Sequence, residues 1–229
     1  MTLPEGSRVA VYYAPAPDDD LARLSAAWLG RDPGRAEPQP RPDIRGLDAV
    51  TDEPGLYGFH ATLKPPMRLR PGVDWDALAD AARELAASIA AFDLPPLAVA
   101  ELHGFLALRE TVPSPQLQAL ADLCVAGLDE FRALPTCVEF ARRCRAGLSI
   151  QQQAMLRRWG YPYVFGTWFF HMTLTRRLTS DETAHYRPAA ERYFAAALRQ
   201  PRRVADICLF TQAAPGQPFR IAARLPLAD

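Results

Sequence analysis

The sequence contains a single lysine and no excess of either charge. Of its 26 basic residues only Lys64 is a lysine, and 26 acidic residues leave a formal net charge of zero. Proteins that bind long nucleic acid usually carry a basic excess, because counterion release supplies much of their affinity. The balance argues against DNA as a partner and favours a small phosphorylated substrate or a short RNA end, which needs only a local positive site.

Long hydrophobic runs and paired cysteines are lacking as well. No apolar run approaches the roughly 18 residues of a membrane span, and the N-terminus lacks the basic-then-apolar layout of a signal peptide. We therefore expect a cytoplasmic protein with no membrane partner. The cysteines form no C-x-x-C pair and have no histidine at metal spacing, so we expect packed, reduced thiols. They are Cys124, Cys137, Cys144 and Cys208.

Hydrophobic residues are plentiful, at 49% of the chain, and can bury a sizeable core. A length of 229 residues predicts one large domain or two small lobes that share a core. We expect a single bilobal domain and a monomer. The expected parts are lobe one at about 1–130, a helical insert at about 131–160 and lobe two at about 161–229.

Two segments of the chain resemble each other and predict a duplicated fold. Tyr57-Gly-Phe-His60-Ala-Thr62-Leu63 aligns without gaps on Trp168-Phe-Phe-His171-Met-Thr173-Leu174. Each copy continues into a helical pattern, then a proline, then a β-rich stretch. The repeated order predicts an α+β architecture in which two antiparallel sheets face a central cleft and the helices lie outside.

The repeated element is a His-x-Thr motif on a predicted strand. Residues two apart on a strand point to the same side, so His60 shares a face with Thr62, and His171 shares one with Thr173. If the strands meet across a cleft, the set suits a phosphodiester. One neutral histidine accepts a proton and the other, protonated, donates one to the leaving oxygen.

The threonine hydroxyls complete this predicted chemistry by donating hydrogen bonds to the non-bridging phosphate oxygens. The sequence has none of the carboxylate clusters that a two-metal phosphatase needs. We therefore expect metal-independent acid–base catalysis with no cofactor.

Paired H-x-T motifs about a hundred residues apart resemble those of the 2H phosphoesterase superfamily. The segment GFHATLKPP around His60 and the aromatic run before HMTL are similar to its phosphonate-metabolism-associated branch, which is often encoded near carbon–phosphorus lyase genes. The resemblance covers nearly the whole chain. It implies a two-lobed fold, His60 and His171 as the acid–base pair, and Thr62 and Thr173 as phosphate ligands.

The resemblance also implies a 2′,3′-cyclic or other ribose-linked phosphodiester as the substrate, and for the phosphonate branch a ribosyl phosphate. Which histidine is the acid and which is the base stays open. Lys64 follows Thr62 at strand spacing, so we predict that it binds phosphate too, whereas the second copy has Thr175 there. Tyr57 and Trp168, three residues before each histidine, are interpreted as core residues.

The insert between the copies carries two further patterns. Ser149 and Gln152 form a capping box, which predicts a helix that ends at Gly160. Three arginines precede it and are interpreted as a solvated basic patch, with a lid over the substrate as the alternative. They are Arg142, Arg143 and Arg145.

Three other functions remain compatible with these observations. The same site could carry out RNA 2′–5′ ligation or process a short RNA end. A binding module for a nucleotide or sugar phosphate could keep the fold without turnover, although intact histidines in both motifs argue against it. A structural accessory of a phosphonate-degrading complex rests on the family resemblance alone.

Overall fold

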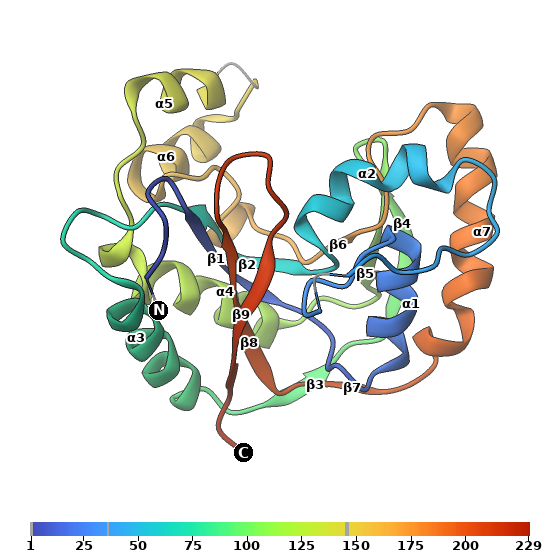
Figure 1. Ribbon diagram of the computed structural model, residues 1–229, viewed down its shortest axis with the longest axis horizontal. Helices are drawn as coiled ribbons and strands as arrows, with labels where there is room; N and C mark the ends of the chain where they lie inside the picture. The colour runs from blue at the N-terminus through green and yellow to red at the C-terminus, as the bar shows by residue number, and fades with distance from the viewer. Residues whose placement is uncertain (1, 36, 145–146) are drawn as a thin grey trace.

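The computed structural model describes residues 2–35, 37–144 and 147–229, and within them the chain folds as an α+β protein (Figure 1). The strands are β1 (Arg8–Tyr13), β2 (Ala61–Met67), β3 (Phe92–Leu94), β4 (Leu97–Leu102), β5 (Phe105–Glu110), β6 (Met172–Thr173), β7 (Arg202–Val204), β8 (Asp206–Gln212) and β9 (Arg220–Pro226). The α-helices are α1 (Asp20–Leu29), α2 (Leu47–Tyr57), α3 (Trp75–Ala87), α4 (Pro115–Gly127), α5 (Cys137–Cys144), α6 (Ile150–Trp159) and α7 (Ser180–Leu198). Two 3₁₀ turns are η1 (Asp129–Phe131) and η2 (Phe165–Thr167). No helix in the described ranges is both long and apolar enough to cross a bilayer.

The predicted α+β class with antiparallel strands is confirmed, but the sheets are arranged differently from our expectation. Seven strands form one sheet in the order β4-β5-β6-β2-β1-β8-β9, and β3 pairs with β7 in a small second sheet. The two sheets that we expected to face each other are therefore halves of one sheet. The two motif strands, β2 and β6, join them through the pair Ala61 and Met172 (Figure 1).

Each half of the sheet combines strands of both repeats. The hairpin β4–β5 of the first repeat pairs with β6 of the second, while the hairpin β8–β9 of the second repeat reaches β2 of the first through β1. The helices follow the same exchange, because α3 packs on β8 and β9 and α7 packs on β4 and β5 (Figure 1). Each half of the sheet therefore contains segments from before and after the expected insert at about 131–160.

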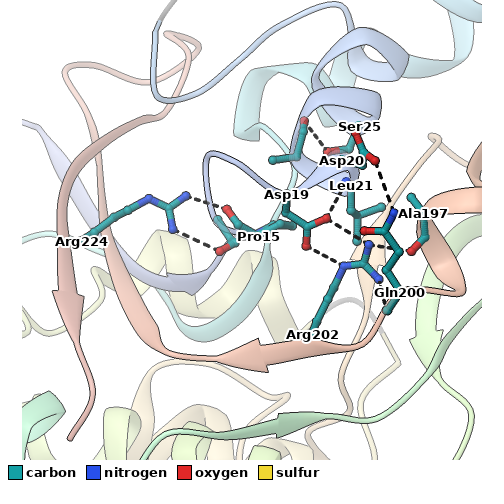
Figure 2. A network of polar contacts seen from close by, with 11 residues as sticks. Pro15, Asp19, Asp20, Leu21, Ser25, Ala197, Gln200, Arg202 and Arg224 are labelled. Carbon is teal, nitrogen blue, oxygen red and sulfur yellow. Dashed lines mark hydrogen bonds and ion pairs between the residues drawn. The ribbon is translucent and has the colours of Figure 1, made fainter. Parts of the chain in front are cut away.

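A polar network connects the start of α1 to the end of α7 and the start of β7 (Figure 2). Asp19 caps α1 by accepting a hydrogen bond from the backbone N–H of Leu21, at 2.7 Å. The same carboxylate pairs with Arg202, whose Nε lies 2.7 Å from Oδ2 and whose side chain is only 6% exposed. Arg202 also donates to the carbonyl of Ala197 near the end of α7. One buried ion pair thus holds together segments that are about 180 residues apart in sequence.

Candidate active site

A cavity of about 690 Å³ lies where the two motif strands meet. His60, Thr62, His171 and Thr173 all line it. The structure therefore brings together the two histidines and two threonines that the sequence repeat singled out. We call this cavity the catalytic cleft, after the role that we propose for it below.

Gly58 sets the direction in which the first motif enters the cleft. It ends α2 with a φ of 75°, a backbone conformation that side-chain-bearing residues rarely adopt. A Cβ atom there would also lie 2.7 Å from Pro33. Its carbonyl accepts a hydrogen bond from Nδ1 of His60 at 2.9 Å. The glycine thus both turns the chain into β2 and orients the imidazole.

This hydrogen bond defines the tautomer of His60. A carbonyl oxygen can only accept, so Nδ1 carries the proton and Nε2 of the neutral ring keeps its lone pair. The hydroxyl of Thr62 lies 3.3 Å from that Nε2 and donates to it. The ring stacks on Tyr12, with 3.7 Å between centroids and an interplanar angle of 20°. The imidazole therefore presents a fixed proton acceptor to the cleft.

His171 repeats this arrangement in the second motif. Its Nδ1 donates to the carbonyl of Phe169 at 3.2 Å, so both histidines use the carbonyl two residues before them. Aromatic rings again confine the imidazole, with Phe169 at 4.8 Å and Phe105 at 5.9 Å between centroids. The same local hydrogen bond thus occupies Nδ1 of both rings and leaves Nε2 as the second polar atom of each.

Burial favours the neutral form of both imidazoles in the free protein. Burial lowers the pKa of His60 to about 4, against the opposing effect of its hydrogen bond to Gly58, and the nearby His171 lowers it further. Burial also lowers the pKa of His171, against its hydrogen bond to Phe169, and Arg109 adds to the lowering. A bound phosphate anion beside these rings has the opposite effect, because negative charge favours the imidazolium.

Lys64 does not join this group, which corrects its predicted role. Its ammonium donates to the carbonyl of Val125 at 2.9 Å and lies 3.6 Å from the carboxylate of Asp129, on the other side of the sheet. The side chain is 2% exposed and does not line the catalytic cleft.

A β-bulge in β2 explains why Lys64 does not lie on the same side of the sheet as Thr62, as strict alternation had predicted. Tyr12 pairs with Thr62 but its neighbour Val11 pairs with Lys64, so Leu63 is an extra residue in β2. Tyr12 and Val11 face opposite sides of β1, and Lys64 therefore points to the side opposite Thr62.

The two aromatic residues expected in the core, Tyr57 and Trp168, do pack against buried core clusters, and each also contacts the site. Tyr57 lines the catalytic cleft and stacks on Phe219, with 5.3 Å between centroids. Trp168 is half-buried, and its indole N–H donates to the backbone carbonyl of Thr62 at 2.8 Å. This bond ties the approach to the second motif directly to the first motif strand.

Sequence reasoning missed two residues of β1 that line the cleft, Arg8 and Tyr12. Neither belongs to a motif, and only the pairing of β1 with β2 brings them to the site. Of the three arginines of the insert, Arg143 lines the cleft. Arg145 and the side chain of Arg142 lie outside what the structure describes.

Within the described ranges no group of three or more His, Cys, Asp and Glu side chains is placed to hold a metal ion.

Comparison with known proteins identifies relatives along nearly the whole chain. A model of the family described as "Protein of unknown function (DUF1045)" matches residues 62–220. A ribose 1,5-bisphosphate phosphokinase PhnN from Janthinobacterium sp. (strain Marseille) is 38% identical over 231 residues, which is 97% of this chain and 51% of the relative. A protein of the same name from Laribacter hongkongensis (strain HLHK9) is 36% identical over 217 residues, covering 93% and 50%. The chain thus spans about half the length of these curated relatives.

Solved structures with a similar course of the chain show much lower identity. E. coli LigT complexed with NADP+ has a TM-score of 0.43 and 13% identity, over 98% of this chain and 99% of that one. A structure described as a phosphoesterase has a TM-score of 0.42 and 13% identity, over 98% and 100%. Similarity at this level leaves the function to be argued from the cleft itself.

Proposed function

Because the chain belongs to the DUF1045 family, whose description assigns no function, we propose an activity from the catalytic cleft. The protein is a metal-independent phosphodiesterase of the 2H type that hydrolyses a cyclic or ribose-linked phosphodiester. One observation carries the proposal. Two histidines, each fixed by the carbonyl two residues before it, present Nε2 to one cavity together with the motif threonines.

The reaction divides between the two histidines. The neutral histidine takes a proton from water, whose oxygen attacks phosphorus, and the bond from phosphorus to one ribose oxygen breaks. The other histidine becomes protonated when the anionic substrate binds and gives this proton to the leaving oxygen. Thr62 and Thr173 donate hydrogen bonds to the non-bridging oxygens as their charge increases. The diester and one water thus become a phosphomonoester with a free hydroxyl.

We assign the base to His60 and the acid to His171. The pKa of His60 is lowered to about 4, so this ring is the better candidate for the neutral partner. The stacked Tyr12 and the hydrogen bond from Nδ1 to the Gly58 carbonyl hold the ring in place, and Nε2 becomes free when Thr62 turns its hydroxyl from this atom to the phosphate. Burial also lowers the pKa of His171, but no hydroxyl of its own motif is bonded to its ring in the part of the chain that the structure describes, and a bound phosphate anion favours its protonated form.

The names of the curated relatives suggest which sugar is involved. Hydrolysis of a 1,2-cyclic phosphodiester of ribose 5-phosphate gives ribose 1,5-bisphosphate, the compound in those names. A Walker-type phosphate loop needs the sequence Gly-Lys-[Ser/Thr], whereas the one lysine of this chain follows Leu63 and is buried. The phosphokinase activity is therefore best placed in the half of the relatives that this chain does not span, with the cyclic phosphodiesterase supplying its substrate.

The first test is turnover of a substrate panel in the presence of a chelator. The panel contains 2′,3′-cyclic nucleotides, cyclic ribose phosphates and short 2′–5′ linked RNA, with products identified by phosphorus NMR. His60→Ala and His171→Ala lower turnover by roughly 10²–10⁴-fold. His185→Ala is the matched control, because His185 is an exposed histidine on α7 outside the cleft. A folded protein that turns over no member of the panel, or loses all turnover with chelator, rules the proposal out.

A second measurement separates the acid from the base. A p-nitrophenyl phosphodiester has a leaving group that needs no protonation, so it bypasses the acid but not the base. His171→Ala therefore loses much less activity on this substrate than on a ribose diester, while His60→Ala loses activity on both. The reverse pattern would exchange the two assignments.

A further inference from the structure

A second cavity, of about 380 Å³, adjoins the catalytic cleft. Arg8, Pro65, Pro66 and Arg143 line both cavities and therefore form their common border. We call the smaller one the side cavity. A substrate held at the two histidines lies in a cavity that shares this basic border.

The side cavity is strongly basic, although the chain as a whole carries no net charge. Its basic lining residues are Arg8, Lys64, Arg68, Arg132 and Arg143, and its one acidic lining residue is Glu139. Most of this charge is already balanced by carboxylates. Arg68 pairs with Glu139 at 2.9 Å and Arg132 pairs with Asp129 at 2.7 Å. Lys64 is also close to Asp129.

Arg8 differs from these residues, because no carboxylate pairs with it in the part of the chain that the structure describes. Its Nε donates to Oε1 of Gln212 at 2.7 Å, and its guanidinium lies 5.4 Å from the ring centroid of Phe219. Gln212 is 3% exposed and is held in turn by the carbonyl of Gln217, at 2.6 Å. A buried glutamine thus orients the guanidinium through Nε and leaves its two terminal nitrogens for another partner.

The strand β1 places this arginine in line with the catalytic histidine. Arg8 and Tyr12 are four residues apart on β1 and point to the same side, and Tyr12 stacks under His60. Their Cα atoms are about 13 Å apart at the usual rise of a strand. Since Arg8 also lines the catalytic cleft, one sugar unit can lie between the histidines and the guanidinium.

We propose that Arg8, together with Arg143 on the common border of the two cavities, forms a subsite for a second phosphate of the substrate. The substrate is then a sugar with a phosphodiester at the histidine pair and a phosphomonoester at its other end. Arginine suits this role because its planar fork binds phosphate through two parallel hydrogen bonds. This inference rests on the proposed phosphodiesterase function and specifies its substrate.

The test compares two substrates that differ only in the distal phosphate, 2′,3′-cyclic AMP and its 5′-phosphorylated derivative. The wild-type protein prefers the 5′-phosphorylated compound by about 10- to 100-fold in kcat/KM, the range for hydrogen bonds to a charged group. Arg8→Gln reduces this ratio to near one, and Arg8→Lys retains part of it. Using the ratio cancels any effect of the substitution on folding or on the chemical step.

Arg177→Gln is the matched control, since Arg177 is an exposed arginine that lines the catalytic cleft but not the side cavity. It keeps the preference. A wild-type ratio near one, a ratio that Arg8→Gln leaves unchanged, or a ratio lost in Arg177→Gln overturns the subsite.

Binding of ribose 5-phosphate, measured by calorimetry, separates this inference from the proposed function. If neither cyclic nucleotide is hydrolysed, the phosphodiesterase proposal fails on these substrates. The subsite then stands only if ribose 5-phosphate binds to the wild type and to His60→Ala, and binds at least tenfold more weakly to Arg8→Gln. Absence of binding, or equal binding to all three proteins, overturns it.

Discussion

The lowered pKa of His60 makes the stability of the fold depend on pH in a way that can be measured without any substrate. In the unfolded chain the imidazole takes up a proton near pH 6.5, but in the folded protein it does so only near pH 4. Between these values the unfolded state binds more protons than the folded state. The free energy of unfolding therefore falls as the pH falls from 6.5 towards 4, and this contribution is fully present above pH 6.5.

The size of the effect follows from the two pKa values. Between pH 7 and pH 5, His60 alone lowers the free energy of unfolding by about 2 kcal/mol. For a protein of this size, that is a shift of roughly 0.7 M in the urea midpoint if the slope is about 3 kcal/mol/M. Urea unfolding of the wild type and of His60→Asn at both pH values measures the contribution of His60 to this pH dependence. Asparagine keeps a donor for the carbonyl of Gly58 but does not titrate. Between pH 7 and pH 5 the His60→Asn protein therefore loses about 2 kcal/mol less of its free energy of unfolding than the wild type does.

His185→Asn is the control for replacing a histidine by asparagine, because the ring of His185 is exposed on α7, away from the cleft. His171 titrates in all of these proteins, so its share cancels in the comparison. Equal pH dependence in the wild type and in His60→Asn would mean that the imidazole titrates near its ordinary pKa. The argument that the base is held neutral by burial would then fail.

Three further outcomes test other parts of the structure. Lys64→Met lowers the free energy of unfolding by about 1–3 kcal/mol, because a buried charged hydrogen bond is lost while Asp129 keeps its arginine partners; turnover stays within about threefold, and a larger loss would return this lysine to the catalytic cleft. Asp19→Ala removes both a helix cap and a buried partner of Arg202, so urea unfolding shows a loss of about 2–4 kcal/mol, and a loss under 1 kcal/mol would contradict the role of the network. Because the pKa of both cleft histidines lies below 6.5 in the free protein, kcat/KM on a cyclic phosphodiester falls about tenfold per pH unit above that value, whereas a plateau to pH 8 in the pH–rate profile would contradict it.

The sequence was informative wherever a local pattern determines local structure. The capping box of Ser149 and Gln152 is formed at the start of α6, and Gly160 ends that helix in a left-handed conformation. The matched His-x-Thr segments predicted a shared site because a duplicated strand presents the same side chains twice. The structure brings both motifs to one cleft, while the catalytic roles of their residues remain predictions.

Prediction failed where one residue changes the register of a strand. The expectation for Lys64 used strict alternation from Thr62, and the bulge at Leu63 puts Lys64 on the opposite side, ahead of a second register shift between Lys64 and Met67. No property of Leu63 signals a bulge, since leucine also fits a regular strand. Arg8 was missed for a related reason, because its place in the cleft depends on pairing between β1 and β2, which are about 50 residues apart.

The exchange of hairpins has a consequence for how the site is held together. His60 leads into β2, whose half of the sheet is completed by β8 and β9 from the end of the chain, while His171 leads into β6, which pairs with β5 from the first repeat. Neither repeat can therefore form its own half of the cleft alone. The indole of Trp168, bonded to the carbonyl of Thr62, adds a direct link between the motif strands where only one residue pair joins them. Since acid–base catalysis needs both imidazoles at fixed positions relative to one phosphate, this interlocking supplies rigidity that two independent lobes would lack.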